Sequence, residues 1–519
     1  MNTTGKNHSF GPLFFTNLWG VLNDNFLKSL ACFVAVKWVS PEYETLLISL
    51  AAGALVLPYL LLSPLADRLT HRFRKVRVVR LAKWAELPII ALAVAGFCFH
   101  SVATVIAAIV LMGVQSALYS PSKFGLVRDI GGLDRVSVGM GGMEAIGFAG
   151  MLLGTVLAAF AADHFRPVHT YLIMGASCLL GLGGAYWLHA EETPETEQWP
   201  VNPLKFFVSS LRKADQYEGL PPVLFVLSWF WWMAALMQMS LLVYCQHRLG
   251  LDSFHTGLVM ALAAVGITAG CWIAGKIDQK WRLLRFGSLL GMVLAVEFVL
   301  LFALPWTPMS FSIALLITTL TAGCFKIPLD AEIQRSAKGP TLNLMLAFFN
   351  QLSFLFILLA SATLTLLCLL LDIRFVFLLI ALVLTAVSLY LLISHRVVLT
   401  ATIDRLLLHR YDIRVSGRKL LQDDTTKLIL PNHSAVIDPI IVFSHFYDCH
   451  MRPLVDEAYF EAGAFRRILQ IFDAIRVPDL RKSRQGVGQV RQLESLVLES
   501  LAQGHNVIFY PSGHITLDG

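Results

Sequence analysis

Residues 67–80 read DRLTHRFRKVRVVR, a strongly basic stretch that separates two long apolar runs. Six of its fourteen residues are Arg or Lys. In membrane proteins, Arg and Lys next to apolar segments are enriched on the cytosolic side. A second basic connection, later in the chain, contains Lys276, Lys280, Arg282 and Arg285. The two stretches predict a protein that crosses a membrane several times and keeps these connections in the cytosol.

The composition also favours a membrane protein. Of the 519 residues, 56% are hydrophobic and only 15% are charged, whereas soluble domains carry about 25% charged residues. The formal net charge is +6, but the basic residues lie between apolar runs and no aromatic-basic motif accompanies them, which argues against a nucleic-acid partner. The eight cysteines are scattered without a Cys-x-x-Cys pair, so we expect free thiols and no metal site.

Twelve apolar runs reach the length of about 18 residues that a membrane-spanning helix needs. They begin near residues 12, 46, 78, 102, 140, 168, 222, 255, 283, 308, 342 and 374, and the last ends near residue 394. The connections after odd-numbered runs are poor in Arg and Lys, so both termini are predicted to be cytoplasmic. The membrane-embedded part is therefore expected to be an all-α, multi-pass bundle.

The chain divides into two six-helix halves and a tail. The expected segments are a first half at 1–190, a cytosolic linker at 191–221, a second half at 222–394, a membrane-proximal connector at 395–420 and an α/β segment at 421–519. The two halves contain a weak internal sequence repeat. Pro64–Arg68 leaves the second run much as Ala274–Asp278 leaves the eighth, and Pro121–Lys123 corresponds to Phe325–Pro328. Such internal repeats are typical of transporters.

Two six-helix halves with Asp-Arg before a basic loop resemble the major facilitator superfamily, over roughly residues 10–395. Within it, three motifs resemble bacterial lysophospholipid transporters: Asn23-Asp24-Asn25, Tyr119–Gly125 and Gly142–Ala145. The resemblance implies import of lysophospholipids through the bacterial inner membrane. It also implies that Asp67, Arg68 and Asp278 act in gating, by holding the two halves together.

Polar residues inside the predicted spans are candidates for substrate binding, because a charge at membrane depth is costly. Asn17, Asp24 and Lys28 follow i, i+7, i+11 spacing and share one helical face. That face is expected to border the central cavity. Asp24 and Lys28 are also one turn apart, so the alternative is that they neutralise each other and only hold the fold.

A lysophospholipid headgroup that pairs an amine with a phosphate needs one anionic and one cationic partner. We assign the amine to Asp24 and the phosphate to Lys123 or Arg335, with Glu144 and Glu297 as further acids within spans. Lys123 stands at the end of a span, so its side chain reaching into the membrane interface is the competing interpretation.

The tail contains the motif PNHSAVID at residues 431–438, directly after the strand-like run KLIL. Asn-His-x4-Asp resembles the first motif of glycerolipid acyltransferases. A glycerol hydroxyl is a weak nucleophile near neutral pH, so a histidine must take its proton as it attacks a thioester carbonyl. His433 is the expected base, and Asp438 would orient its ring.

A second stretch, VIFYPSG at residues 507–513, stands where the acyltransferases carry a Phe-Pro-Glu-Gly phosphate-binding motif. The resemblance makes Asn432, Pro511 and Gly513 candidates for substrate binding, although Ser512 replaces the usual glutamate. The sequence stops at Gly519, so we expect a partial acyltransferase domain whose activity stays open. No cofactor is expected to be bound; the acyl donor would be a thioester of acyl carrier protein or coenzyme A.

Three functional hypotheses follow. In the favoured one, the halves move lysophospholipid toward the cytosolic leaflet, and the tail reacylates it, with acyl carrier protein as a further partner. The alternative is a facilitator-type exporter of small molecules or drugs with a truncated, inactive acyltransferase remnant. The third, an acyltransferase that the helices merely anchor, is disfavoured, since one or two spans suffice for an anchor.

Overall fold

The computed structural model describes most of the chain as two compact units. The described residues are 9–192, 200–217, 219–337, 339, 341–421, 425–433, 435, 437–446, 449, 451–461, 463–478 and 486–511. The first unit comprises residues 1–283 and 289–388, and the second comprises residues 284–288 and 389–519.

The first half of the first unit consists of long helices joined by short connections. They are α1 (Gly11–Val34), α2 (Pro41–Arg72), α3 (Lys75–Cys98), α4 (Val102–Gly131), α5 (Val136–His164) and α6 (Pro167–Trp187). Proline stands in the first turn of α1, α2 and α6, where its missing N–H is not needed by the helix. All six begin within about five residues of the starts predicted from the apolar runs.

A short helix, not expected from the sequence, precedes the second half. Within the expected linker, α7 (Pro203–Ala214) is capped by the side chain of Asn202, which accepts from the N–H groups of Leu204 and Lys205. The long helices follow as α8 (Leu220–His247), α9 (Ser253–Trp281), α10 (Gly287–Ala303), α11 (Pro308–Ser336), α12 (Thr341–Leu370) and α13 (Phe375–Ser394).

In the described part of the chain, ten helices are long and apolar enough to cross a membrane. They are α3 to α6 and α8 to α13. Helix α1 is also 24 residues long, but Asn17, Asn23, Asp24, Asn25 and Lys28 make it more polar. The protein is therefore a multi-pass helical membrane protein, and its twelve spans remain a prediction.

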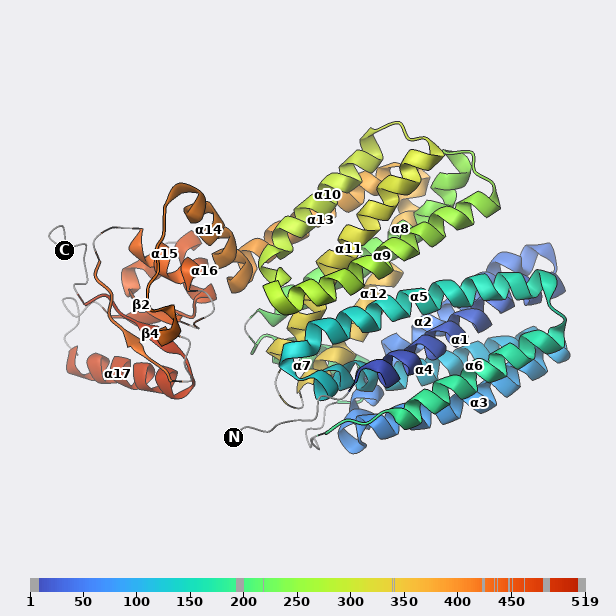
Figure 1. Ribbon diagram of the computed structural model, residues 1–519, viewed down its shortest axis with the longest axis horizontal. Coiled ribbons are helices and arrows are strands. Elements are labelled where there is room, and N and C mark those ends of the chain that lie inside the picture. The colour runs from blue at the N-terminus through green and yellow to red at the C-terminus, as the bar shows by residue number, and fades with distance from the viewer. Residues whose placement is uncertain are drawn as a thin grey trace. The chain divides into compact units, whose positions relative to one another are not determined.

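The helices of each half pack mainly on one another. In the first half α1 lies against α5 and α6, and α4 lies against α2 and α3; in the second, α8 packs on α12 and α9 on α11. The halves meet where α5 runs beside α9 and α2 beside α12 (Figure 1). A side chain at Gly141 of α5 would place its Cβ 2.6 Å from the carbonyl oxygen of Cys271 on α9. Glycine is therefore required at this crossing.

The second unit joins a helix to a small α/β fold. Its main elements are α14 (Arg396–Arg410), β1 (Leu428–Ile429), α15 (Asp438–His445), β2 (Met451–Asp456), α16 (Gly463–Ile471), β3 (Ile475–Val477), α17 (Gly486–Ala502) and β4 (Asn506–Ile508). The four strands form a parallel sheet in the order β1-β4-β2-β3. Parallel neighbours need crossover connections, and α15, α16 and α17 lie in those connections.

Sheet pairing places the two strand-like runs of the tail side by side. Leu428 of β1 pairs with Val507 of β4, and Val507 and Ile508 are fully buried. Because both strands run in the same direction, the segments that follow them leave the sheet at one edge. That edge carries the Asn-His motif after β1 and Tyr510-Pro511 after β4.

Candidate functional sites

The polar face of α1 is tied to α4 and α5 inside the first half. Asn17 donates to the carbonyl oxygen of Met143 (3.1 Å) and accepts from the Lys123 ammonium (3.1 Å). That ammonium also lies 5.2 Å from the ring centroids of both Tyr119 and Phe124, a favourable distance for a cation facing an aromatic ring. Lys123 is therefore buried among these groups instead of extending toward the membrane interface.

Asp24 and Lys28 point to different partners. The hydroxyl of Ser116 on α4 donates to Asp24 (2.8 Å), whereas the Lys28 ammonium donates to the side-chain oxygen of Asn25 (3.1 Å). Among the described residues, no ion pair within 4 Å joins Asp24 to Lys28. The two side chains therefore form no direct ion pair, and the choice between substrate binding and a structural role stays a prediction.

A buried ion pair in α3 was missed in the sequence. The Lys83 ammonium lies 2.6 Å from the Glu86 carboxylate, and both side chains are almost fully buried. Asn23 of α1 donates to the second oxygen of Glu86 (2.7 Å), and Ser177 of α6 donates to Asn23 (2.8 Å). We call Lys83, Glu86, Asn23 and Ser177 the first-half cluster. A Lys and a Glu three residues apart within an apolar run are the signal that would have revealed it.

A second buried group of charges joins the two halves. The Lys326 ammonium of α11 lies 2.5 Å from the Asp330 carboxylate on the same helix and 3.0 Å from the Glu144 carboxylate on α5. Lys326 has no solvent exposure, and its ammonium is 5.3 Å from the ring centroid of Trp231 on α8. We call Glu144, Lys326 and Asp330 the interhalf triad.

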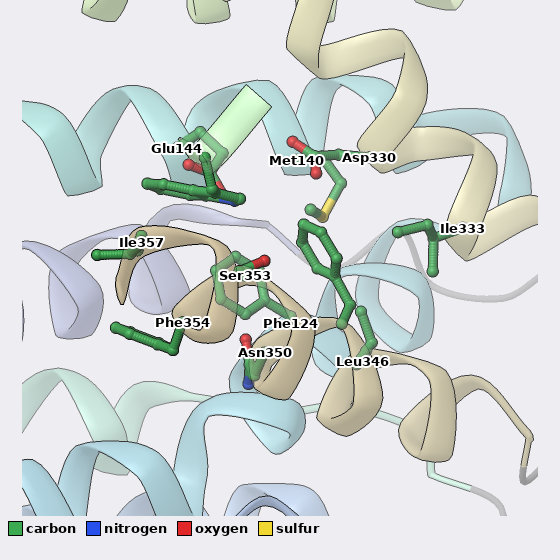
Figure 2. A pocket seen from close by; sticks show the side chains of 12 residues that line it. Phe124, Met140, Glu144, Asp330, Ile333, Leu346, Asn350, Ser353, Phe354 and Ile357 are labelled. Atoms are coloured by element: carbon green, nitrogen blue, oxygen red, sulfur yellow. The ribbon is translucent and has the colours of Figure 1, made fainter. Parts of the chain in front are cut away.

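A pocket between the halves borders this triad. Its cavity volume is about 80 Å³, room for a few water molecules. Glu144 and Asp330 lie on one side of it and Asn350 on the other, with Phe124 between them (Figure 2). Its lining residues are Phe124, Met140, Glu144, Trp231, Asp330, Ile333, Leu346, Phe349, Asn350, Ser353, Phe354 and Ile357. A whole lipid does not fit this volume, so the halves must move apart to admit one.

Arg335 lies outside the lining of that pocket, although we assigned it to substrate phosphate. Its guanidinium is 2.8 Å from the Asp278 carboxylate of α9 and donates to the Ser137 hydroxyl of α5 (2.5 Å). Ser137 in turn donates to Asp278. The structure therefore places Arg335 with the predicted gating residue Asp278, in a link that spans both halves.

Other links between the halves lie close by. The Arg128 guanidinium of α4 donates to the carbonyl oxygens of Gln334, Ala337 and Gly339 at the end of α11, where the helix dipole favours a cation. Asn350 of α12 donates to the Ser120 hydroxyl (2.9 Å). Neither link was expected from the sequence. These links and the triad lie toward the predicted cytosolic ends of the helices, so the halves are closed at that end.

Asp67 and Arg68 differ in their surroundings. Asp67 is fully buried with its carboxylate 3.1 Å from the His71 ring, whereas Arg68 is exposed. Beside them, the carboxylate of Glu192 accepts from the N–H groups of Lys75 and Val76 at the start of α3. Partial burial raises the pKa of Glu192, although those N–H groups oppose the rise. Glu192 thus caps the N-terminus of α3 near the predicted gate, where the helix dipole favours a negative charge.

The second unit brings His433 and Asp438 together at the carboxyl edge of the sheet. His433 Nδ1 is 3.5 Å from Asp438 Oδ2, and the N–H of Ala435 donates to the same oxygen (2.7 Å). The Tyr510 ring, which follows β4, has its centroid 4.7 Å from that of His433. Burial and the Asp438 charge raise the pKa of Tyr510 to about 12, so its phenol stays protonated.

The remaining acyltransferase candidates are placed only in part. Asn432 and Pro511 are exposed near His433, at the ends of the segments that leave β1 and β4. Gly513 and its neighbours Ser512 and His514 lie outside the described residues. The edge therefore brings together a histidine, a carboxylate and a phenol, the groups needed to move a proton.

Two helical halves that meet around a mostly apolar pocket have the architecture of a facilitator-type membrane transporter. The sequence profile of the Major Facilitator Superfamily matches residues 29–361, and the chain belongs to this superfamily. It is distantly related to the lysophospholipid transporter LplT of Pectobacterium carotovorum, with 26% identity over 338 residues, 64% of this chain and 79% of that protein. The LplT of Escherichia coli O157:H7 is 26% identical over 290 residues, 54% of this chain and 69% of that protein.

Solved structures share the fold. The Escherichia coli fucose:proton symporter FucP superimposes with a TM-score of 0.59 at 11% identity, covering 74% of this chain and 97% of that one. The human organic anion transporter MFSD10 gives a TM-score of 0.58 at 14% identity, covering 73% and 99% of the two chains. At these identities the likeness concerns the fold alone.

Proposed function

We propose that this protein moves lysophospholipids across the bacterial inner membrane to the cytosolic leaflet and reacylates them with its tail. The observation that carries the proposal is the relation to LplT over 338 residues. In this proposal twelve helices span the membrane, with α1 and α2 completing the ten most apolar ones, and both termini are cytoplasmic.

Transport would proceed by rocking of the two halves around the pocket. The described interhalf links close the predicted cytosolic end, so a lipid would enter from the opposite end and leave after these links open. Asp24 is the proposed first contact for the substrate amine, because a neutral donor, Ser116, holds its carboxylate, and among the described residues it forms no ion pair within 4 Å. Lys123 and Asn17 would meet the phosphate.

Reacylation would use His433 as a general base. Its ring accepts the proton of the free glycerol hydroxyl while that oxygen attacks the carbonyl carbon of the acyl thioester. The tetrahedral intermediate then expels the thiolate, which takes the proton from His433, so the products are a diacyl lipid and a free thiol. Asp438 would hold the ring and stabilise its protonated form.

The two activities are tested by supplying labelled lysophosphatidylethanolamine to spheroplasts and measuring uptake and conversion separately. Asp24→Asn is expected to lower uptake at least about tenfold, because a carboxylate that pairs with an amine is lost. Asp163→Asn, at an exposed site near the end of α5, is the matched control. Unchanged uptake in Asp24→Asn contradicts the site, and drug efflux without lipid uptake favours the exporter.

His433→Ala is expected to abolish conversion to diacyl lipid while uptake continues, since general-base catalysis contributes about 10²–10⁴-fold. His445→Ala is the control, because His445 forms a separate pair with Asp404 (2.9 Å). Conversion that persists in His433→Ala would show that another enzyme does the chemistry.

A further inference from the structure

We infer that the exposed face of α7 is a binding surface for anionic phospholipids of the cytosolic leaflet. The α7 surface consists of an apolar stripe, formed by Leu204, Val208 and Leu211, and of two cations beside it, Lys205 and Arg212. The inference concerns neither the transported lipid nor the tail. It therefore goes beyond the proposed function and does not depend on it.

The apolar stripe of α7 faces away from the protein. Leu204, Val208 and Leu211 follow i, i+4, i+7 spacing, so they lie on one side of the helix. Their side chains are 74%, 42% and 51% exposed. A helix with an apolar stripe and basic residues beside it lies at the boundary between lipid headgroups and acyl chains. The stripe therefore fits the surface layer of a membrane.

The charge of α7 indicates which lipids it binds. Residues 203–214 contain Lys205, Arg212 and Lys213 and no acidic residue. Lys205 and Arg212 are seven positions apart, so they share one side of the helix next to the stripe. Both are exposed, and among the described residues neither has an ion-pair partner within 4 Å. A groove of about 550 Å³ borders both side chains, which leaves room for a phosphate group of a lipid.

The chain keeps α7 close to the membrane. Helix α8 is long and apolar enough to cross it, and only residues 215–219 separate the end of α7 from the start of α8. Such a segment reaches at most about 20 Å. This connection is predicted to be cytosolic, and the cytosolic leaflet is the one that carries anionic lipids. A soluble anion could pair with the cations but would leave the apolar stripe in water.

The opposite face of α7 is fixed to both halves of the protein. The ring of Phe207 meets that of Phe348 on α12 edge to face, with centroids 5.3 Å apart. The side-chain amide of Gln351 on α12 donates to the carbonyl oxygens of Pro203 (3.3 Å) and of Leu60 on α2 (3.2 Å). Helix α2 belongs to the first half and α12 to the second. A lipid bound to the α7 surface thus contacts an element that touches both.

The test labels the unaltered protein in phosphatidylcholine vesicles that contain a trace of photoactivatable lipid. The probe is either phosphatidylglycerol or phosphatidylcholine, with the same diazirine in its acyl chain, and adducts are mapped to residues 203–214 by mass spectrometry. Each cation near the membrane favours an anionic lipid about fivefold, so the two should enrich the phosphatidylglycerol probe on α7 more than about tenfold. Salt at about 1 M, which screens charges beyond about 3 Å, should remove most of this enrichment.

Three results would overturn the inference. Equal labelling by the two probes would show that α7 does not select anionic lipids. The absence of adducts on α7 would show that another segment of the chain or a second copy covers the stripe. Labelling that inorganic phosphate at millimolar concentration removes as well as unlabelled phosphatidylglycerol does would show a site for a soluble anion.

Two double variants test the cations. Lys205→Gln/Arg212→Gln removes both charges and should lower labelling by the phosphatidylglycerol probe at least about tenfold. Lys205→Arg/Arg212→Lys keeps both charges and should be labelled like the parent. Thermal unfolding in detergent is expected to be unchanged in both, since the side chains are exposed. A folded Gln variant that is labelled like the parent contradicts the inference, and the result on the unaltered protein decides if that variant does not fold.

Discussion

The protein contains two buried lysine clusters of similar chemistry and different composition. In the first-half cluster, one ammonium meets one carboxylate, and Asn23 satisfies the remaining oxygen of Glu86. In the interhalf triad, one ammonium meets two carboxylates from opposite halves. The first-half cluster joins helices of one half, whereas the interhalf triad joins α5 of the first half to α11 of the second. The two clusters therefore differ both in their ratio of ammonium groups to carboxylates and in the helices that they hold together.

The largest expected effect is on the first-half cluster. Lys83→Ala leaves Glu86 buried without its cation, which costs about 3–5 kcal/mol of folding free energy. Thermal unfolding in detergent, followed by the yield of monodisperse protein, measures this loss. The double variant Lys83→Met/Glu86→Leu is the control and should recover most of the stability, because no charge is left buried. A single variant as stable as the parent would show that the pair contributes little.

Two glycines of α5 allow a comparison of contacts between the halves with contacts inside one half. Substitution at the first is expected to affect transport, and substitution at the second is expected to affect stability. A Cβ at Gly141 would collide with α9 of the other half, whereas one at Gly154 would collide with the carbonyl of Leu22 on α1 in the same half. Gly141→Val is expected to lower uptake more than about tenfold, equivalent to about 1.4 kcal/mol, by forcing the halves apart. Gly154→Val should chiefly lower the unfolding temperature.

The control for both glycine variants is Gly147→Ala, because the nearest atom to a Cβ there is 3.9 Å away. It should change neither uptake nor stability. If Gly141→Val transports normally, the crossing of α5 and α9 is not part of the moving surface.

The smallest effect is expected at an exposed pair beyond the clusters. Asp372 accepts from the N–H of Arg374 (3.0 Å) and pairs with Arg248 (2.7 Å). The Arg374 N–H, followed by Arg248, lowers the pKa of Asp372 below its ordinary value of 3.8. Its stabilisation is therefore present above that value and disappears as the pH falls through the lowered pKa. Asp372→Asn should cost well under 1 kcal/mol at neutral pH, and thermal unfolding at low pH should show no difference.

The features that could be predicted from the sequence are those that depend on local pattern. The apolar runs and basic loops predicted the positions of the long helices. The length and polarity of a segment largely determine whether it can span a membrane, and the flanking charges determine its orientation. The Asn-His-x4-Asp motif placed His433 after a strand for a similar reason: a buried strand followed by polar residues is a local signal. Residues 203–214 were expected in a polar linker, yet α7 buries Phe206 and Ala214, a helical spacing that was overlooked.

The contacts between the halves could not be read from the sequence. Glu144 was singled out as an acid within a span, but its partner Lys326 is 182 positions away, and only packing of α5 beside α11 joins them. Arg335 was assigned to substrate because it is a cation near the end of a span. Its place beside Asp278 and Ser137 depends on how three helices meet. A charge can be located by its sequence position, but its partner is decided by tertiary structure.

The glycine crossing of α5 and α9 also determines how far the ends of the helices travel. Gly141 is five residues from the start of α5 and 23 residues from its end, or about 8 Å and 35 Å along the axis. If the helix pivots there as a rigid lever, each ångström of displacement at the short arm becomes about four to five ångströms at the long arm. Closure at the short arm, where the interhalf links lie, would therefore accompany a separation several times larger at the opposite end of the halves.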